Sequence, residues 1–137
     1  MEIFAVIDTN VLVSALLAKR TDSPPRLIID HLFSGHFTPI YNKEILAEYK
    51  EVLLRPKFKF SEDLVEVVIN GIEEIGIPLE RIRSNINMPD PKDVVFYEVA
   101  LAKESSFLIT GNIKHFPKEP FIVTPSEMIQ IINSVGF

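Results

Sequence analysis

The feature of this sequence that most restricts its fold is a short, wholly apolar run at residues 3–7 (IFAVI) that ends at Asp8-Thr9-Asn10. Such a run is typical of a strand buried on both faces of a parallel sheet. Residues 107–109 and 121–123 have the same character. Residues 37–41 and 77–82 are weaker candidates, the former because Pro39 interrupts it. These runs predict a mostly parallel sheet.

Between these runs, apolar residues recur at helical spacing. We predict helices over 11–18, 23–35, 42–54, 61–76 and 91–103, and a last helix after a capping box at 124–127 (TPSE). Asn42 and Ser61 are suited to be N-caps. Strands that alternate with helices indicate an α/β fold. We therefore expect one domain over residues 1–137, a three-layer α/β/α sandwich with a mostly parallel central sheet.

Composition limits the chemistry that is open to the chain. The absence of cysteine excludes disulfides, a thiol nucleophile and sulfur-ligated metals, and only three histidines are present. A formal net charge of −5 argues against broad coating of nucleic acid. No apolar segment is long enough to span a membrane, and Glu2 makes a signal peptide a poor interpretation of the N-terminus. We expect a cytoplasmic protein.

Polar residues fall at strand ends and helix starts, where parallel α/β sheets place their sites. Asp8 follows the first strand, so it is either a helix N-cap or a ligand, and Asn10 could cap that helix instead. Glu48 lies at the margin of the apolar stripe of its helix. The side chain of such a glutamate either extends into solvent or takes part in a functional site. Both residues are candidates for a functional site.

A second acidic group is Asp90-Pro91-Lys92-Asp93, which reads as a capped helix start. Capping does not explain why Asp93 shares a face with Phe96 and Tyr97 in a helix that is apolar nearly all round, because a charge there needs a partner or a metal. Thr110-Gly111-Asn112 follows a predicted strand and is either a polar turn or a source of an oxygen ligand.

Carboxylates that converge repel one another and are stable together only with protons or cations bound. Oxygen ligands select Mg²⁺ or Mn²⁺ over metals that prefer sulfur. Two such ions can activate a water and stabilise the leaving oxygen in phosphodiester cleavage. The acidic residues therefore suggest a metal-dependent hydrolase.

The same segments resemble the PIN-domain nucleases, and most closely those that act as toxins of toxin–antitoxin pairs. The resemblance is carried by residues 6–12 (VIDTNVL), 44–49 (EILAEY), 51–58 (EVLLRPKF), 90–93 (DPKD) and 108–112 (LITGN), with His115-Phe116. It spans nearly the whole chain in the right order, and the first and last segments are fairly specific as a pair.

The resemblance implies a Mg²⁺ (or Mn²⁺) site and cleavage of single-stranded RNA. It makes Asp8, Glu48 and Asp93 the acids of that site, with Asp90 as an accessory ligand. Asn112 stands where many members have a fourth Asp, and we count it with the catalytic residues. We expect the site to be supported, or the substrate contacted, by Thr9, Asn10, Thr110 and Lys114.

The resemblance also suggests a homodimer and a small antitoxin that covers the site. Because Asn112 removes one charge, a second interpretation stays open. In that interpretation the chain is a catalytically weak PIN-like domain that binds RNA or a partner without cutting.

Overall fold

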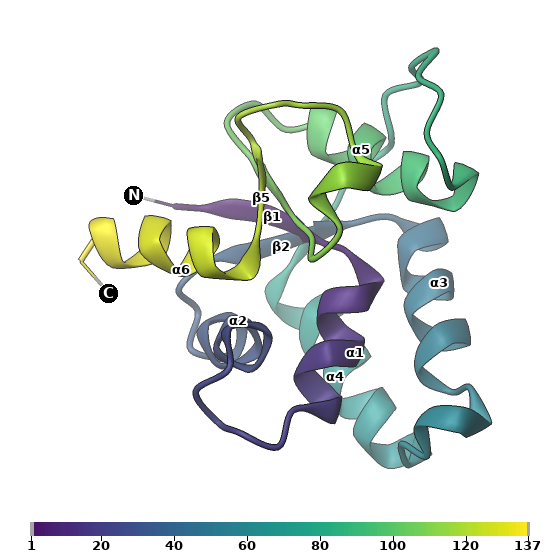
Figure 1. The fold of residues 1–137 in the computed structure, drawn as a ribbon, viewed down its shortest axis with the longest axis vertical. Helices are drawn as coiled ribbons and strands as arrows, with labels where there is room; N and C mark the ends of the chain where they lie inside the picture. The colour runs from purple at the N-terminus through teal and green to yellow at the C-terminus, as the bar shows by residue number, and fades with distance from the viewer. Residues whose placement is uncertain (1, 137) are drawn as a thin grey trace.

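A five-stranded sheet forms the centre of the computed structural model, which describes residues 2–136 (Figure 1). The strands lie in the order β3-β2-β1-β4-β5, and every pairing between neighbours is parallel. Their bounds are β1 Phe4–Ile7, β2 Thr38–Tyr41, β3 Ile77–Pro78, β4 Phe107–Ile109 and β5 Ile122–Val123. The predicted parallel sheet is confirmed.

Helices cover both faces of this sheet, which confirms the predicted α/β/α sandwich. In Figure 1, α5 lies on one side of the strands, and α1, α2 and α4 lie on the other. The α-helices are α1 Thr9–Leu17, α2 Pro24–Phe33, α3 Lys43–Leu53, α4 Glu62–Ile75, α5 Val94–Leu101 and α6 Pro125–Ser134. Three short 3₁₀ helices are η1 Pro56–Phe58, η2 Pro91–Asp93 and η3 Ile113–His115.

Three of the predicted helix starts are confirmed by side-chain hydrogen bonds. The side chains of Asn42 and Ser61 accept backbone N–H groups at the starts of α3 and α4. Thr124 and Glu127 form the reciprocal capping box at α6. Each cap satisfies amides that the first helical turn leaves without partners.

Two boundaries differ from the prediction. The helix expected over 91–103 begins as the 3₁₀ turn η2 and is α-helical only over Val94–Leu101. The strand expected over 77–82 is reduced to Ile77–Pro78, because the chain then leaves β2 and turns toward α5. There the N–H of Ile82 donates to the backbone carbonyl of Glu98 at 3.2 Å.

The position of β1 decides where a site can form. Its residues Ala5, Val6 and Ile7 are at most 1% exposed, as expected for a strand with helices on both faces. The chain runs outward from β1 through β2 to β3, and then returns to β4 on the other side of β1. The carboxyl ends of β1 and β4 therefore flank the point where the strand order reverses, which is where open α/β sheets bind ligands.

Candidate functional site

Asp8 and Thr110 meet at this reversal point. Asp8 follows β1, and its backbone N–H donates to the carbonyl of Ile109 at 2.9 Å, which extends the ladder to β4. The Thr110 hydroxyl donates to Oδ2 of Asp8 at 2.8 Å. Both residues are buried, at 3% and 0% exposure. The sheet therefore holds one carboxylate of the site in a fixed orientation.

The Asp8 carboxylate is not used to cap the following helix. Asp8 occupies the N-cap position of α1, but its side chain accepts no capping hydrogen bond. The expectation that Asn10 could cap this helix is wrong, because α1 already begins at Thr9 and Asn10 lies in its first turn. The Asp8 carboxylate instead accepts a hydrogen bond from the Thr110 hydroxyl, and its role as a ligand stays a prediction.

Helix α3 brings Glu48 to the same place. The Thr9 hydroxyl donates to Oε2 of Glu48 at 3.2 Å, so the residue next to Asp8 orients the second acid. One residue further along α3, the buried Tyr49 hydroxyl donates to the carbonyl of Ile7 at 2.5 Å. This bond connects α3 to the end of β1 and so fixes the position of Glu48 relative to the sheet.

Most of the predicted site residues line one pocket of about 270 Å³. It is lined by Asp8, Thr9, Asn10, Glu48, Val52, Arg55, Asp90, Lys92 and Asp93. We call it the acidic pocket. Thr110 supports it through its bond to Asp8. Asn112 and Lys114 are not in its lining and instead line a neighbouring hollow with Gly111, Ile113 and His115.

Asn112 is connected to the acidic pocket only indirectly. Its backbone N–H donates to the Thr110 hydroxyl at 3.0 Å, and that hydroxyl in turn holds Asp8. The backbone at Asn112 thus completes the support of the first acid. The structure does not bring the Asn112 side chain into the lining of the acidic pocket.

Two acids of this pocket, Asp8 and Asp93, have a raised pKa. Burial raises the pKa of Asp8, and the nearby charge of Glu48 adds to this, while the Thr110 hydroxyl opposes it. Burial, together with the charges of Asp8 and Asp90, raises the pKa of Asp93 to about 6, against the opposing influence of His115. The carboxylates therefore repel one another across the pocket.

The carboxylate oxygens of the acidic pocket are donors of the kind that bind a divalent cation. Within residues 2–136, no three carboxylate or imidazole side chains converge tightly enough to enclose an ion. The donors are nevertheless of the right kind, since the pocket wall carries four carboxylates and the chain has no sulfur of cysteine to offer. Their mutual repulsion is what a hard cation relieves. That Asp8 and Asp93 share one ion, with Glu48 nearby, stays a prediction.

Sequence reasoning missed two cations in this pocket, Arg55 and Lys92. It assumed that no cation lies among the acids, and it interpreted Arg55, which precedes Pro56, as the end of a helix and as part of a solvated basic group. A signal was present, because Glu48, Val52 and Arg55 follow one another by four and three residues. That spacing places them on one face of a helix.

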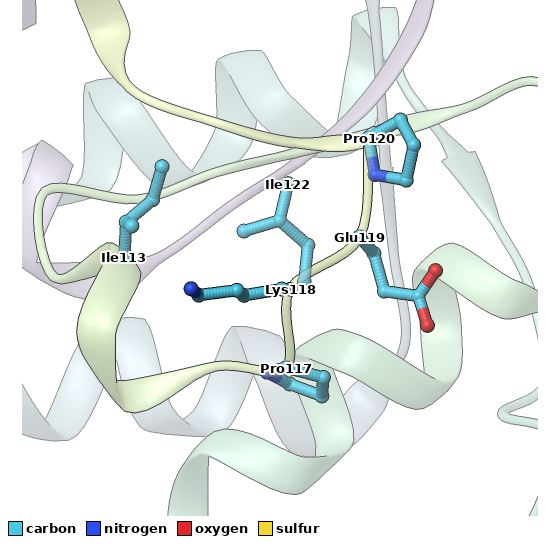
Figure 2. Close-up of a pocket in the computed structure, with 6 residues that line it drawn as sticks. All are labelled: Ile113, Pro117, Lys118, Glu119, Pro120 and Ile122. Atoms are coloured by element: carbon cyan, nitrogen blue, oxygen red, sulfur yellow. The ribbon is translucent and has the colours of Figure 1, made fainter.

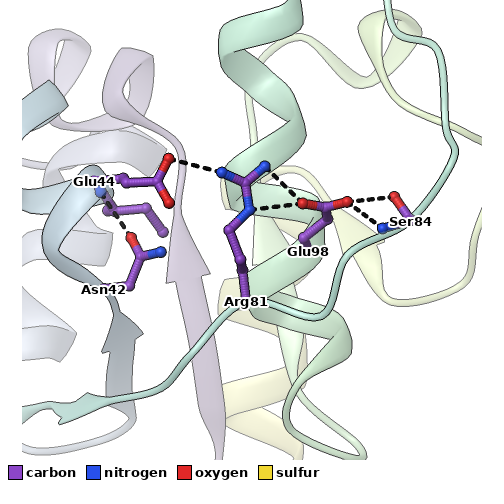
Figure 3. Close-up of polar contacts among 6 residues, drawn as sticks. Asn42, Glu44, Arg81, Ser84 and Glu98 are labelled. Atoms are coloured by element: carbon purple, nitrogen blue, oxygen red, sulfur yellow. Dashed lines mark hydrogen bonds and ion pairs between the residues drawn. The ribbon is translucent and has the colours of Figure 1, made fainter.

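It also missed a buried ion-pair network behind the pocket (Figure 3). Glu98 of α5 is 1% exposed and binds Nε of Arg81 at 2.7 Å and its Nη2 at 2.6 Å. The backbone N–H and the hydroxyl of Ser84 also donate to Glu98, the hydroxyl at 2.7 Å. The Nη1 atom of Arg81 reaches Glu44 at the start of α3, at 2.7 Å. A helix that was expected to be apolar nearly all round thus carries one buried, fully paired carboxylate.

This network holds residues 79–90 in place. Burial alone would raise the pKa of Glu98, but the bonds from Ser84 and Arg81 outweigh it and lower that pKa below its usual value. The segment so anchored contains little regular structure and leads directly into Asp90 and η2. The network therefore anchors, at Arg81 and Ser84, the segment that precedes Asp90.

A second pocket, of about 370 Å³, has a different chemistry. Figure 2 shows Ile113 and Ile122 facing it, with Lys118 across the opening and Pro117 and Pro120 at its rim. Its one carboxylate, on Glu119, points away from the opening. This pocket is larger than the acidic one, but it gathers no set of groups that could perform a reaction.

Comparison with protein families assigns the chain to one family. Residues 5–114 match the family described as the PIN domain, which is well over half of the chain. The chain therefore belongs to the PIN-domain family, whose members are in general nucleases. No curated protein and no solved structure matches it significantly. Within residues 2–136, no helix has both the length and the apolar character needed to cross a bilayer.

Proposed function

We propose that this protein is a Mg²⁺- or Mn²⁺-dependent endoribonuclease that hydrolyses phosphodiester bonds of single-stranded RNA. The observation that carries the proposal is the acidic pocket at the sheet reversal point, with Asp8 buried and oriented by Thr110. Three of the four carboxylates accept a hydrogen bond from a hydroxyl or a backbone N–H, but no ion pair neutralises any of them among the described residues. They suit hard cations and the phosphate groups that such cations bind.

In this proposal Asp8, Glu48 and Asp93 hold the cation, and Asp90 assists. A divalent ion bound there would supply an activated water and stabilise charge on the phosphate oxygens. The protein contributes orientation. Thr110 fixes Asp8 at 2.8 Å and Thr9 holds Glu48 at 3.2 Å, so two of the ligands are set before substrate arrives.

The first experiment follows cleavage of an unstructured, labelled RNA by the wild type and by Asp8→Asn. We expect cleavage in Mg²⁺ or Mn²⁺, none in excess chelator, and a loss of activity in Asp8→Asn, whose side chain has the same shape but no charge. Full activity in chelator would refute the mechanism. Metal-independent RNA binding without cleavage would instead support the weak-nuclease interpretation that Asn112 suggests.

We further propose that the nuclease is a cytoplasmic toxin, that it forms a homodimer, and that a small antitoxin covers the acidic pocket. These points rest on the resemblance to toxins of toxin–antitoxin pairs. Induced expression of the wild type should arrest bacterial growth, whereas Asp8→Asn should not. Light scattering on the purified protein tests the dimer, and growth arrest by Asp8→Asn as strong as by the wild type would contradict the toxin assignment.

A further inference from the structure

Arg55 occupies an unusual place for a cation. It lies on the wall of the acidic pocket together with Asp8, Glu48 and Asp93, two residues after α3 ends at Leu53. Its side chain is 40% exposed, so the guanidinium lies at the pocket rim and is open to solvent. An arginine in this position either neutralises the acids or serves something that enters the pocket.

The partner of Arg55 shows that it does not neutralise the acids. Its Nη2 atom lies 3.3 Å from both carboxylate oxygens of Glu51, one turn earlier on α3. Glu51 is 58% exposed, and a helical pair of this kind contributes only about 0.3–0.5 kcal/mol. Among the described residues, the ion pair of Arg55 is with Glu51 and not with an acid of the pocket. The guanidinium is therefore held weakly and outside the acid cluster.

The charge of the pocket shows what it is suited to bind. Its four carboxylates and two cations leave a formal charge of −2, which one divalent ion would cancel. A phosphodiester that enters such a pocket brings a further negative charge. A guanidinium can take up that charge with two parallel N–H···O bonds to one phosphate, a geometry that a lysine cannot offer.

We propose that Arg55 is a phosphate-binding residue, which leaves Glu51 and donates to a phosphodiester of the RNA strand that occupies the acidic pocket. The identity of this ligand as RNA rests on the proposed function. The exchange is favourable because a weak, exposed carboxylate pair is replaced by a charge-assisted contact next to the metal site. Glu51 then acts as the resting partner of Arg55.

The test measures binding of a fluorescent single-stranded RNA at several salt concentrations, in an Asp8→Asn background so that the RNA stays intact. Adding Arg55→Ala should weaken binding about tenfold at low salt. It should also make the slope of log K against log[salt] less steep by about 0.7, the value for one phosphate contact on a single strand. Arg55→Lys should keep the slope and lose part of the affinity.

Two control variants separate a phosphate contact from other roles. Lys50→Ala removes an exposed cation in the last turn of α3, outside the pocket lining, and should leave the slope unchanged. Glu51→Gln removes the resting partner and should leave affinity equal or higher. If Arg55 served only to stabilise α3 through Glu51, then Glu51→Gln and Arg55→Ala would weaken binding equally, and the proposal would be overturned.

Cleavage assays distinguish this proposal from the proposed function. Metal-dependent cleavage that Arg55→Ala leaves unchanged, together with an unchanged salt slope, overturns the role of Arg55 alone. If RNA binding depends on Arg55 but the wild type cuts no RNA, the phosphate contact is supported and only the proposed nuclease activity is refuted. A wild type and an Asp8→Asn variant that bind no RNA refute both.

Discussion

The buried network of Figure 3 allows a sharp test, because a single guanidinium contacts one buried and one exposed carboxylate. We predict that Glu98→Gln destabilises the fold by about 3 kcal/mol, near the lower end of the range for breaking a buried ion pair. The cost arises because Glu98 is 1% exposed and accepts bonds from Arg81 and from both donors of Ser84. The predicted loss of stability stays near the lower end of that range because Arg81 keeps its contact with Glu44.

The matched control is Glu44→Gln. It removes the other carboxylate from the same arginine, but the Glu44 side chain is 54% exposed, so its contribution should be about 0–1 kcal/mol. Urea denaturation measures both losses. In thermal melts, Glu98→Gln should lower the Tm by roughly 6–12 °C, and Glu44→Gln by a few degrees at most.

Hydrogen exchange gives a local reading of the same change. Amides of residues 79–90 should exchange faster in Glu98→Gln and stay near wild-type rates in Glu44→Gln, because only the former releases the segment from α5. If the two variants lose the same stability, or if exchange at 79–90 does not change in Glu98→Gln, the buried pair does not anchor this segment and our argument is wrong.

Three further predictions concern the acidic pocket and its support. Mg²⁺ or Mn²⁺ should raise the Tm of the wild type and raise that of Asp93→Asn much less; equal shifts would make Asp93 a helix-start residue only. Thr110→Val, which removes the 2.8 Å bond to Asp8, should raise the Mg²⁺ concentration needed for cleavage about 10–100-fold, as measured by metal titration; an unchanged requirement would show that Asp8 needs no such support. Because the folded pKa of Glu98 is lowered, its stabilising effect is complete above the ordinary value of 4.5 and is lost as the pH falls below it. Denaturation curves should therefore lose stability less steeply in acid for Glu98→Gln than for the wild type, and identical acid limbs would contradict the assigned shift.

The parts of the fold that could be predicted are those that depend on residues close together in the sequence. The apolar run before Asp8 gave the central strand, and the caps at Asn42 and Ser61 gave two helix starts, because each depends on residues a few positions apart. The start of α5 was less well predicted. Pro91 suits the first turn of either helix type, and nothing local distinguishes a 3₁₀ turn there from an α-helix.

The acids that line the pocket could be proposed from the sequence, but its two cations could not. Asp8, Glu48 and Asp93 were found from their places at strand ends and on helix faces, and the structure lines one pocket with them. Arg55 was missed because the Arg-Pro pair was read as a stop signal. Glu98 was missed because its partner Arg81 lies 17 residues earlier in a segment without periodic pattern. Contacts of that kind depend on the path of a loop, which a local pattern does not encode.

The bond between Thr110 and Asp8 joins residues 102 positions apart. During synthesis, Asp8 leaves the ribosome long before β4 exists, so the bond from Thr110 cannot yet form. Contacts between such distant residues are also among the slowest to form in folding. The ribonuclease that we propose would be made on the ribosome, next to the message that encodes it. Because Asp8, Glu48 and Asp93 come from the first, middle and last thirds of the chain, the acidic pocket cannot be complete until most of the chain has been translated.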